Sequence, residues 1–120
     1  MTKPLKSSIS FGKFENIDLR VVQVKSAPMA EGTRHPCRIL TVDAGDLGTF
    51  TSVGQYALLR EEELVGRKVV ACCNLTPRPM GPYTSQVLIL GTPHPDSPPD
   101  QTQALPLYAD ERAANGAYVY

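Results

Sequence analysis

The sequence predicts a mainly β protein, in which five short strands roll into one small barrel and a short helix lies between the third and fourth strands. Three observations predict this fold. Five apolar runs have the length and residue types of strands, turn residues bound them, and a stretch of helix-forming residues follows the third run. The length of 120 residues and the 42% hydrophobic content suit one core, so we predict a single domain over residues 1–120.

The first three strands are predicted at Leu19–Val24, Cys37–Val42 and Thr49–Val53, because these runs are rich in strand formers. The segment Pro28–Pro36 contains glycine, threonine and little that can be buried, so we expect a surface loop there. The run Asp43–Gly48 has turn chemistry and reverses the chain between the second and third strands.

The second half of the barrel begins with a predicted helix at Tyr56–Leu64, which lacks strand alternation and ends before Gly66. A buried strand is expected at Lys68–Cys73. The polar, proline-rich run Asn74–Ser85 is predicted to be a loop, and Gln86–Gly91 is predicted to be the fifth strand.

This element order is that of the oligonucleotide-binding (OB) fold, a five-stranded Greek-key barrel with a helix between strands three and four. Residues 92–120 are predicted to form a C-terminal extension. Its first part, Thr92–Gln103, holds four prolines and is expected to be a connection without secondary structure. Its apolar pieces, Ala104–Tyr108 and Tyr118–Tyr120, are expected to pack on the barrel or on a second copy.

The charge balance limits the partners that the whole chain can attract. Twelve basic and twelve acidic residues give zero net charge, so a polyanion has to be held by a local basic patch. Three cysteines do not make a disulfide framework and favour a reducing compartment. No apolar run approaches the roughly 18 residues of a spanning helix, so we expect a cytoplasmic protein without membrane insertion.

Motifs of catalysis and metal binding are missing from the sequence. It has no nucleophile elbow, phosphate loop or dinucleotide fingerprint, and His35 and His94 lack partners at metal-ligand spacing. The neighbouring Cys72 and Cys73 lie in an apolar run, where a core role is favoured over a redox switch. We therefore predict no catalytic residue, metal or cofactor.

Several segments, in order, resemble the tRNA-binding domain family over roughly residues 11 to 91. They are Phe14-Glu15-Asn16-Ile17-Asp18-Leu19-Arg20-Val21, Arg34-His35-Pro36, Val42-Asp43-Ala44-Gly45, Thr51-Ser52-Val53-Gly54-Gln55, Glu61 through Val70, Asn74-Leu75-Thr76-Pro77-Arg78 and Gly81 through Gly91. The ending, with Ala104-Leu105-Pro106-Leu107 and then Asn115-Gly116-Ala117, resembles the stand-alone dimeric type described as an export-related chaperone more than the domain appended to methionyl- or phenylalanyl-tRNA synthetases. Where family members commonly carry a lysine before the position of Leu40, this chain has Ile39, preceded by Arg38.

The resemblance implies a binding face framed by the first loop and by the loop before the last strand. Arginine suits phosphate, asparagine and serine donate to phosphate or sugar oxygens, and an aromatic ring stacks on a base. The alternative is that these are ordinary solvated residues, with Asn74 and Ser85 bonding their own backbones and Tyr83 covering the barrel mouth. The predicted RNA-binding residues are Arg34, His35, Arg38, Asn74, Arg78, Tyr83 and Ser85.

Aromatic residues at the two ends of the chain predict a homodimer, because exposed aromatic surface is costly unless it is covered. The alternative is docking on the same subunit's barrel. The predicted interface residues are Phe11, Phe14, Tyr108, Tyr118 and Tyr120.

Three functions remain open at this point. The first is a non-catalytic module that binds tRNA or single-stranded RNA, the second is a dimeric chaperone for unfolded or preprotein clients, and the third is an accessory module that recruits tRNA to a synthetase in trans.

Overall fold

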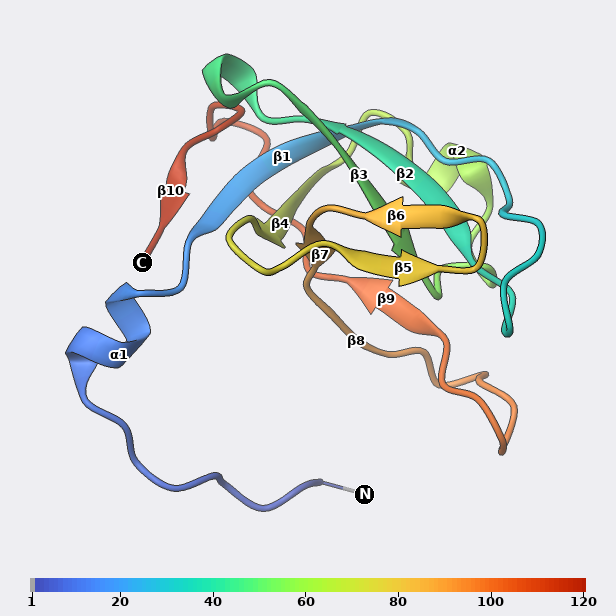
Figure 1. The fold of residues 1–120 in the computed structure, drawn as a ribbon, viewed down its shortest axis with the longest axis horizontal. Helices are drawn as coiled ribbons and strands as arrows, with labels where there is room; N and C mark the ends of the chain where they lie inside the picture. Colours follow the sequence, from blue (N-terminus) through green and yellow to red (C-terminus); the bar gives the residue numbers. More distant parts are fainter. Residues whose placement is uncertain (1) are drawn as a thin grey trace.

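The computed structural model describes residues 2–120 and shows a strongly curved antiparallel sheet that forms a nearly closed barrel (Figure 1). The strand order is β3-β2-β1-β4-β7, and β10 pairs with the free part of β1. The predicted OB-type barrel is therefore confirmed. The bounds of these strands are Leu19–Ser26 for β1, Arg38–Asp43 for β2, Thr49–Gly54 for β3, Lys68–Cys72 for β4, Leu88–Ile89 for β7 and Tyr118–Val119 for β10.

The core lies inside this barrel and is built from the inward residues of the alternating strands. Val22 and Val24 of β1 are fully buried, as are Leu40 and Val42 of β2 and Val69 of β4. The barrel closes between β3 and the segment before β7. Here the backbone N–H of residue 86 donates to the carbonyl of residue 51 (2.8 Å), and the side-chain oxygen of residue 86 accepts from the N–H of residue 51 (2.8 Å).

The helices are short. α1 (Phe11–Glu15) buries no residue, η1 (Gly45–Leu47) forms the predicted reversal, and α2 covers only Glu61–Leu64. The helix predicted to begin at Tyr56 is therefore too long. The Tyr56 side chain is buried in the barrel and its hydroxyl donates to the Ile89 carbonyl (3.0 Å), which holds that residue in a turn before the helix.

Two hairpins replace segments that were predicted as loop or connection. β5 (Arg78–Met80) and β6 (Tyr83–Ser85) pair within the predicted loop 74–85, and this hairpin lies across β3 (Figure 1). The predicted fifth strand is split into β7 and β8 (Gly91–Pro93), and β8 pairs with β9 (Ala104–Pro106). The connection predicted from residue 92 thus begins as a strand.

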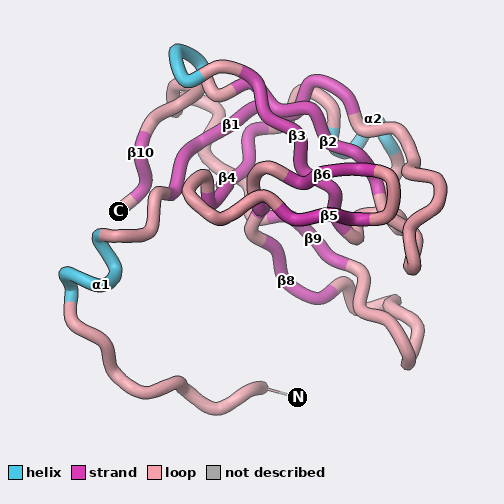
Figure 2. Tube along the Cα trace, in the orientation of Figure 1, coloured by secondary structure: helices cyan, strands magenta, loops and turns pink. Residues whose placement is uncertain are grey.

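The C-terminal extension packs on the barrel of its own subunit. β10 pairs with β1 through Leu19 and Val119, and Tyr108 forms a β-bridge with Val69. By contrast, residues 2–10 extend away from the barrel as an exposed loop (Figure 2). No helix within residues 2–120 is long and apolar enough to cross a membrane.

Candidate nucleic-acid interface

The first loop and the β5–β6 hairpin touch at their tips. The Glu31 N–H donates to the Tyr83 hydroxyl (3.1 Å). Gly81 has a φ of +60°, and a Cβ there would lie 2.4 Å from the Gly32 carbonyl oxygen. Because only glycine allows this backbone approach, the two segments are held in a fixed relation. We call this contact the loop–hairpin junction.

A cavity of 340 Å³ adjoins this junction, and we call it the junction cavity. It combines a guanidinium, an imidazole and an amide with the apolar surfaces of a proline and a methionine. Its lining consists of Thr33, Arg34, His35, Cys37, Gln55, Pro79, Met80 and Gly81.

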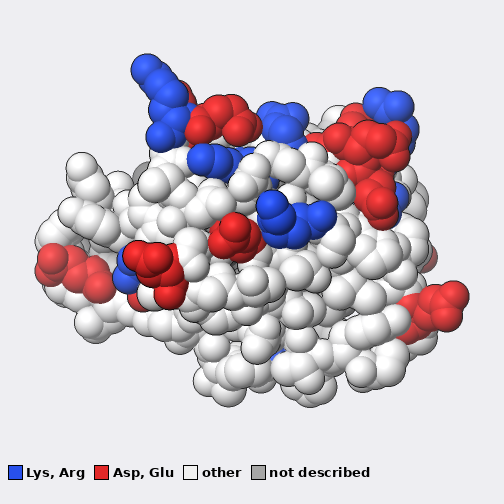
Figure 3. Space-filling model, turned by 90° about the horizontal axis from the view of Figure 1, so that it is seen from above, with Lys and Arg blue, Asp and Glu red and all other residues white. Residues whose placement is uncertain are grey.

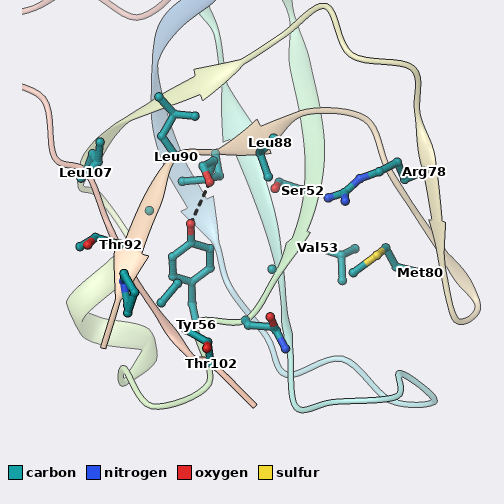
Figure 4. A pocket seen from close by; sticks show the side chains of 16 residues that line it. Ser52, Val53, Tyr56, Arg78, Met80, Leu88, Leu90, Thr92, Thr102 and Leu107 are labelled. Carbon is teal, nitrogen blue, oxygen red and sulfur yellow. Dashed lines mark hydrogen bonds between the residues drawn. The ribbon is translucent and has the colours of Figure 1, made fainter. Parts of the chain in front are cut away.

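A second, larger space of 630 Å³ lies between the β5 strand and the β7–β8 segment, and we call it the hairpin groove (Figure 4). Its walls are mostly apolar, with Met80 facing Val53, and its only charged lining residue is Arg78. Because Gln55 and Met80 line both spaces, the junction cavity and the hairpin groove are neighbours. Arg34 of the first loop lines the junction cavity and Arg78 of β5 lines the hairpin groove, so the two guanidinium groups belong to adjoining spaces.

Two of the predicted RNA-binding residues are engaged in long-range contacts that support the fold. Arg38 donates through Nη1 to the Ala27 carbonyl (2.7 Å) and through Nε to the Leu59 carbonyl (3.1 Å). The Asn74 amide accepts from the Asp18 N–H (2.9 Å) and donates to the Asn16 carbonyl (2.7 Å), which fastens the start of β1 to the end of β4.

Ser85 and Tyr83 also make structural hydrogen bonds. The buried Ser85 hydroxyl accepts from the Val53 N–H (3.0 Å) and donates to the Val87 carbonyl (3.1 Å), so it joins the hairpin to the barrel. The half-buried Tyr83 ring holds the loop–hairpin junction through its hydroxyl. The Tyr83 hydroxyl therefore has a structural role.

Arg34, His35 and Arg78 are the predicted residues whose side chains remain available. Within residues 2–120, neither Arg34 nor Arg78 forms an ion pair or a side-chain hydrogen bond, and both are exposed. Gln55 and Met80 were missed by the sequence analysis. Gln55 ends the matched segment Thr51–Gln55, and a polar residue directly after a strand is the signal that could have found it.

The face of the molecule seen from above, relative to Figure 1, is neither uniformly basic nor uniformly acidic. Basic and acidic side chains are intermixed over part of that face, and much of the rest carries neither (Figure 3). This mixture agrees with the zero net charge of the chain. Attraction of a polyanion therefore rests on local groups such as Arg34 and Arg78.

Four of the five predicted interface aromatics surround one cleft of 560 Å³, which we call the aromatic cleft. The rings of Phe11 and Phe14 are 6.0 Å apart, and those of Tyr118 and Tyr120 are 5.4 Å apart. Phe11, Tyr118 and Tyr120 are 69%, 68% and 90% exposed. Tyr108 does not line this cleft, and its ring lies 3.8 Å under the Arg67 guanidinium.

The cysteines are free and at least half-buried. Cys37 and Cys72 are buried and Cys73 is partly buried, as expected from strand alternation. Burial raises the pKa of both Cys37 and Cys73, which favours the protonated and less reactive thiol.

Comparison with known proteins identifies relatives of this barrel, although no family model matches. The chain is 34% identical over 120 residues to the methionine–tRNA ligase of Streptococcus pyogenes serotype M18, covering 98% of this chain and 17% of the ligase. It is 38% identical over 82 residues to that of Methanopyrus kandleri, covering 68% of this chain and 12% of the ligase. The chain thus spans about one sixth or less of these relatives.

Solved structures match over almost the whole chain. The CsaA chaperone of Bacillus anthracis superposes with a TM-score of 0.80 and 28% identity, covering 95% of this chain and all of that one. The MetRS related protein of Pyrococcus horikoshii gives a TM-score of 0.81 at 24% identity, covering 96% and 100%. At this identity, the match to the Pyrococcus horikoshii protein shows a shared fold.

These matches define the class of the chain: it is a tRNA-binding domain like the corresponding region of methionine–tRNA ligases. The homology covers only that region of the ligases and not the rest of the enzyme. Within the class, its whole length matches the CsaA chaperones, which are the stand-alone type that its C-terminal segments resemble.

Proposed function

We propose that the chain is a non-catalytic, cytoplasmic protein that binds tRNA or single-stranded RNA at the loop–hairpin junction. The observation that carries this proposal is the pair of exposed guanidinium groups, Arg34 in the loop that contacts the hairpin tip and Arg78 at the start of β5, in a domain homologous to the tRNA-binding region of ligases. A guanidinium donates two parallel hydrogen bonds to a phosphate. Neighbouring apolar side chains offer surface to an unpaired base.

Salt dependence provides the test. Two phosphate contacts to a single strand give a slope of about −1.4 in the plot of log affinity against log salt, and each removed contact changes it by about 0.7. Fluorescence anisotropy with unfractionated tRNA, between about 50 and 200 mM salt, measures this slope. Arg34→Ala and Arg78→Ala should each flatten it.

The matched control is Arg112→Ala, because Arg112 is exposed but paired with Asp110 (2.9 Å) and lies in the C-terminal extension. It should leave the slope unchanged. Binding that is absent, or that is equally strong at every salt concentration, refutes the proposal.

A homodimer formed over the aromatic cleft is part of this proposal. The cleft exposes Phe11, Tyr118 and Tyr120 beside the extended residues 2–10, where Leu5 is fully exposed. Covering such a surface removes apolar area from water, which stabilises association. Light scattering should give a dimer for the wild type and a monomer for the Phe11→Ser/Tyr118→Ser double variant. Tyr108→Ser then tests whether the fifth predicted aromatic belongs to the same interface.

A second candidate function is a chaperone for unfolded or preprotein clients, and the hairpin groove favours it. This groove is large and mostly apolar, which suits an extended apolar peptide. Such binding should persist at high salt and prefer unfolded over folded clients. Competition between tRNA and an unfolded client on the same protein separates the two functions.

A third possibility, tRNA recruitment to a synthetase in trans, predicts that affinity capture recovers an aminoacyl-tRNA synthetase. If affinity capture recovers no synthetase, this third function is refuted.

A further inference from the structure

The junction cavity has walls that are fixed before any ligand binds. Its roof is the loop–hairpin junction, where Gly81 and Gly32 approach at backbone level and the Glu31 N–H donates to the Tyr83 hydroxyl. Its inner wall includes Cys37, which is buried. A preformed cavity requires little ordering when a ligand enters, and this favours binding of a small, flat group.

The junction cavity is lined by an amide, an apolar surface and an exposed cation, each contributed by different residues. Gln55 carries an amide that forms no hydrogen bond within residues 2–120, and an amide matches the paired donor and acceptor on a base edge. Pro79 and Met80 offer apolar surface against which a ring can lie. Arg34 is the exposed cation of the rim and suits a phosphate.

The size of the cavity limits what it can hold. A volume of 340 Å³ is at the lower end of the range of small-ligand sites, about 300–1,000 Å³. A cavity of this volume is too small for a folded helix but large enough for one nucleotide. A base inside a duplex cannot present its edge to such a cavity, so the base has to be unpaired and turned out of its stack.

We propose that the junction cavity is the subsite for one unpaired nucleotide of the bound RNA. The base enters against Pro79 and Met80 and is hydrogen-bonded by Gln55, while its phosphate remains at the rim with Arg34. This inference rests on the proposed RNA-binding function and deepens it, because it names the part of the RNA that the site selects. The adjoining hairpin groove, with Arg78, then carries the neighbouring backbone.

The experiment uses the full chain and a fluorescent single-stranded RNA oligonucleotide in which each base is removed in turn. One abasic position should weaken binding about ten-fold, as expected for one base contact. Gln55→Ala and Gln55→Glu should weaken binding of the intact oligonucleotide and should reduce the effect of that abasic position, because only the contact of the base with Pro79 and Met80 then remains. Thr84→Ala, an exposed residue of the same hairpin outside the cavity, should behave like the wild type.

Two outcomes separate this inference from the proposed function. If tRNA binds with the expected salt dependence but no abasic position matters, or a duplex binds as well as the single strand, the nucleotide subsite is refuted and the RNA-binding function stands. If no RNA binds at any salt concentration, both are refuted. Retention of the full abasic effect in Gln55→Glu also refutes the subsite, since the amide then plays no part.

Discussion

Ser85→Ala isolates a hydrogen bond network on which the attachment of the β5–β6 hairpin depends. The Ser85 side chain is buried, with 3% of the residue exposed, and so are Val53 and Val87 beside it. Removing the hydroxyl leaves a buried N–H at Val53 and a buried carbonyl at Val87 without their partner. Each orphaned group costs about 1–3 kcal/mol, so two such groups give an expected loss of about 2–6 kcal/mol.

Urea unfolding followed by circular dichroism measures this loss. With a slope of about 2 kcal/mol per molar urea, the midpoint should fall by about 1–3 M. Thr84→Ala is the control, because residue 84 is exposed on the same strand and should change the midpoint little. At a temperature where the variant is folded, its tRNA affinity should equal that of the wild type. A stable variant that binds RNA weakly would refute the reasoning, because Ser85 would then contact the ligand.

The remaining predictions concern three other contacts. Asn74→Ala removes the side-chain hydrogen bonds to the backbone of residues 16 and 18 and should cost about 1–2 kcal/mol in urea unfolding, whereas Asn74→Asp, which keeps the acceptor, should cost less. Equal stability of all three forms would contradict the role of Asn74 in joining β1 to β4. Gly81→Ala should separate the loop from the hairpin, because its Cβ would meet the Gly32 carbonyl, and should weaken binding of single-stranded RNA; unchanged affinity would show that the junction is not needed. Burial raises the pKa of Tyr56 to about 12, above its value of about 10 in an unfolded chain, so the stability it contributes is complete below pH 10 and is lost as the pH rises to 12. The wild type should therefore lose about 2–3 kcal/mol more than Tyr56→Phe between these pH values, and parallel pH profiles would contradict this assignment.

The first four strands were predictable because each is a run of strand-forming, apolar residues, and in the first two strands the core also imposes alternation. Val22, Val24, Leu40 and Val42 recur with period two and point inward, so the pattern and the structure agree within two residues at each end. The β5–β6 hairpin was not predictable in this way. It buries little of its own, and Pro79 in its first strand is typical of a loop or an edge.

The candidate site was predictable in part for a related reason. The side chain of a loop arginine such as Arg34 or Arg78 is free to bind a ligand unless a residue far along the chain pairs with it. The sequence does not show which such residues lie close in space. Asn74 meets residues 16 and 18, and Arg38 meets carbonyls of residues 27 and 59, so their engagement follows only from the closed barrel. The same closure brings Gln55 and Met80 to one cavity.

The pairing of β10 with β1 has a consequence for synthesis on the ribosome. β1 leaves the ribosome early, but Val119, which covers the edge of β1 at Leu19, lies after every other strand along the chain. Until then the start of β1 has an open edge that can pair with another nascent chain. This strand pair therefore forms only after the other strands of the barrel have been synthesised, and deletion of β10 would leave that edge permanently open.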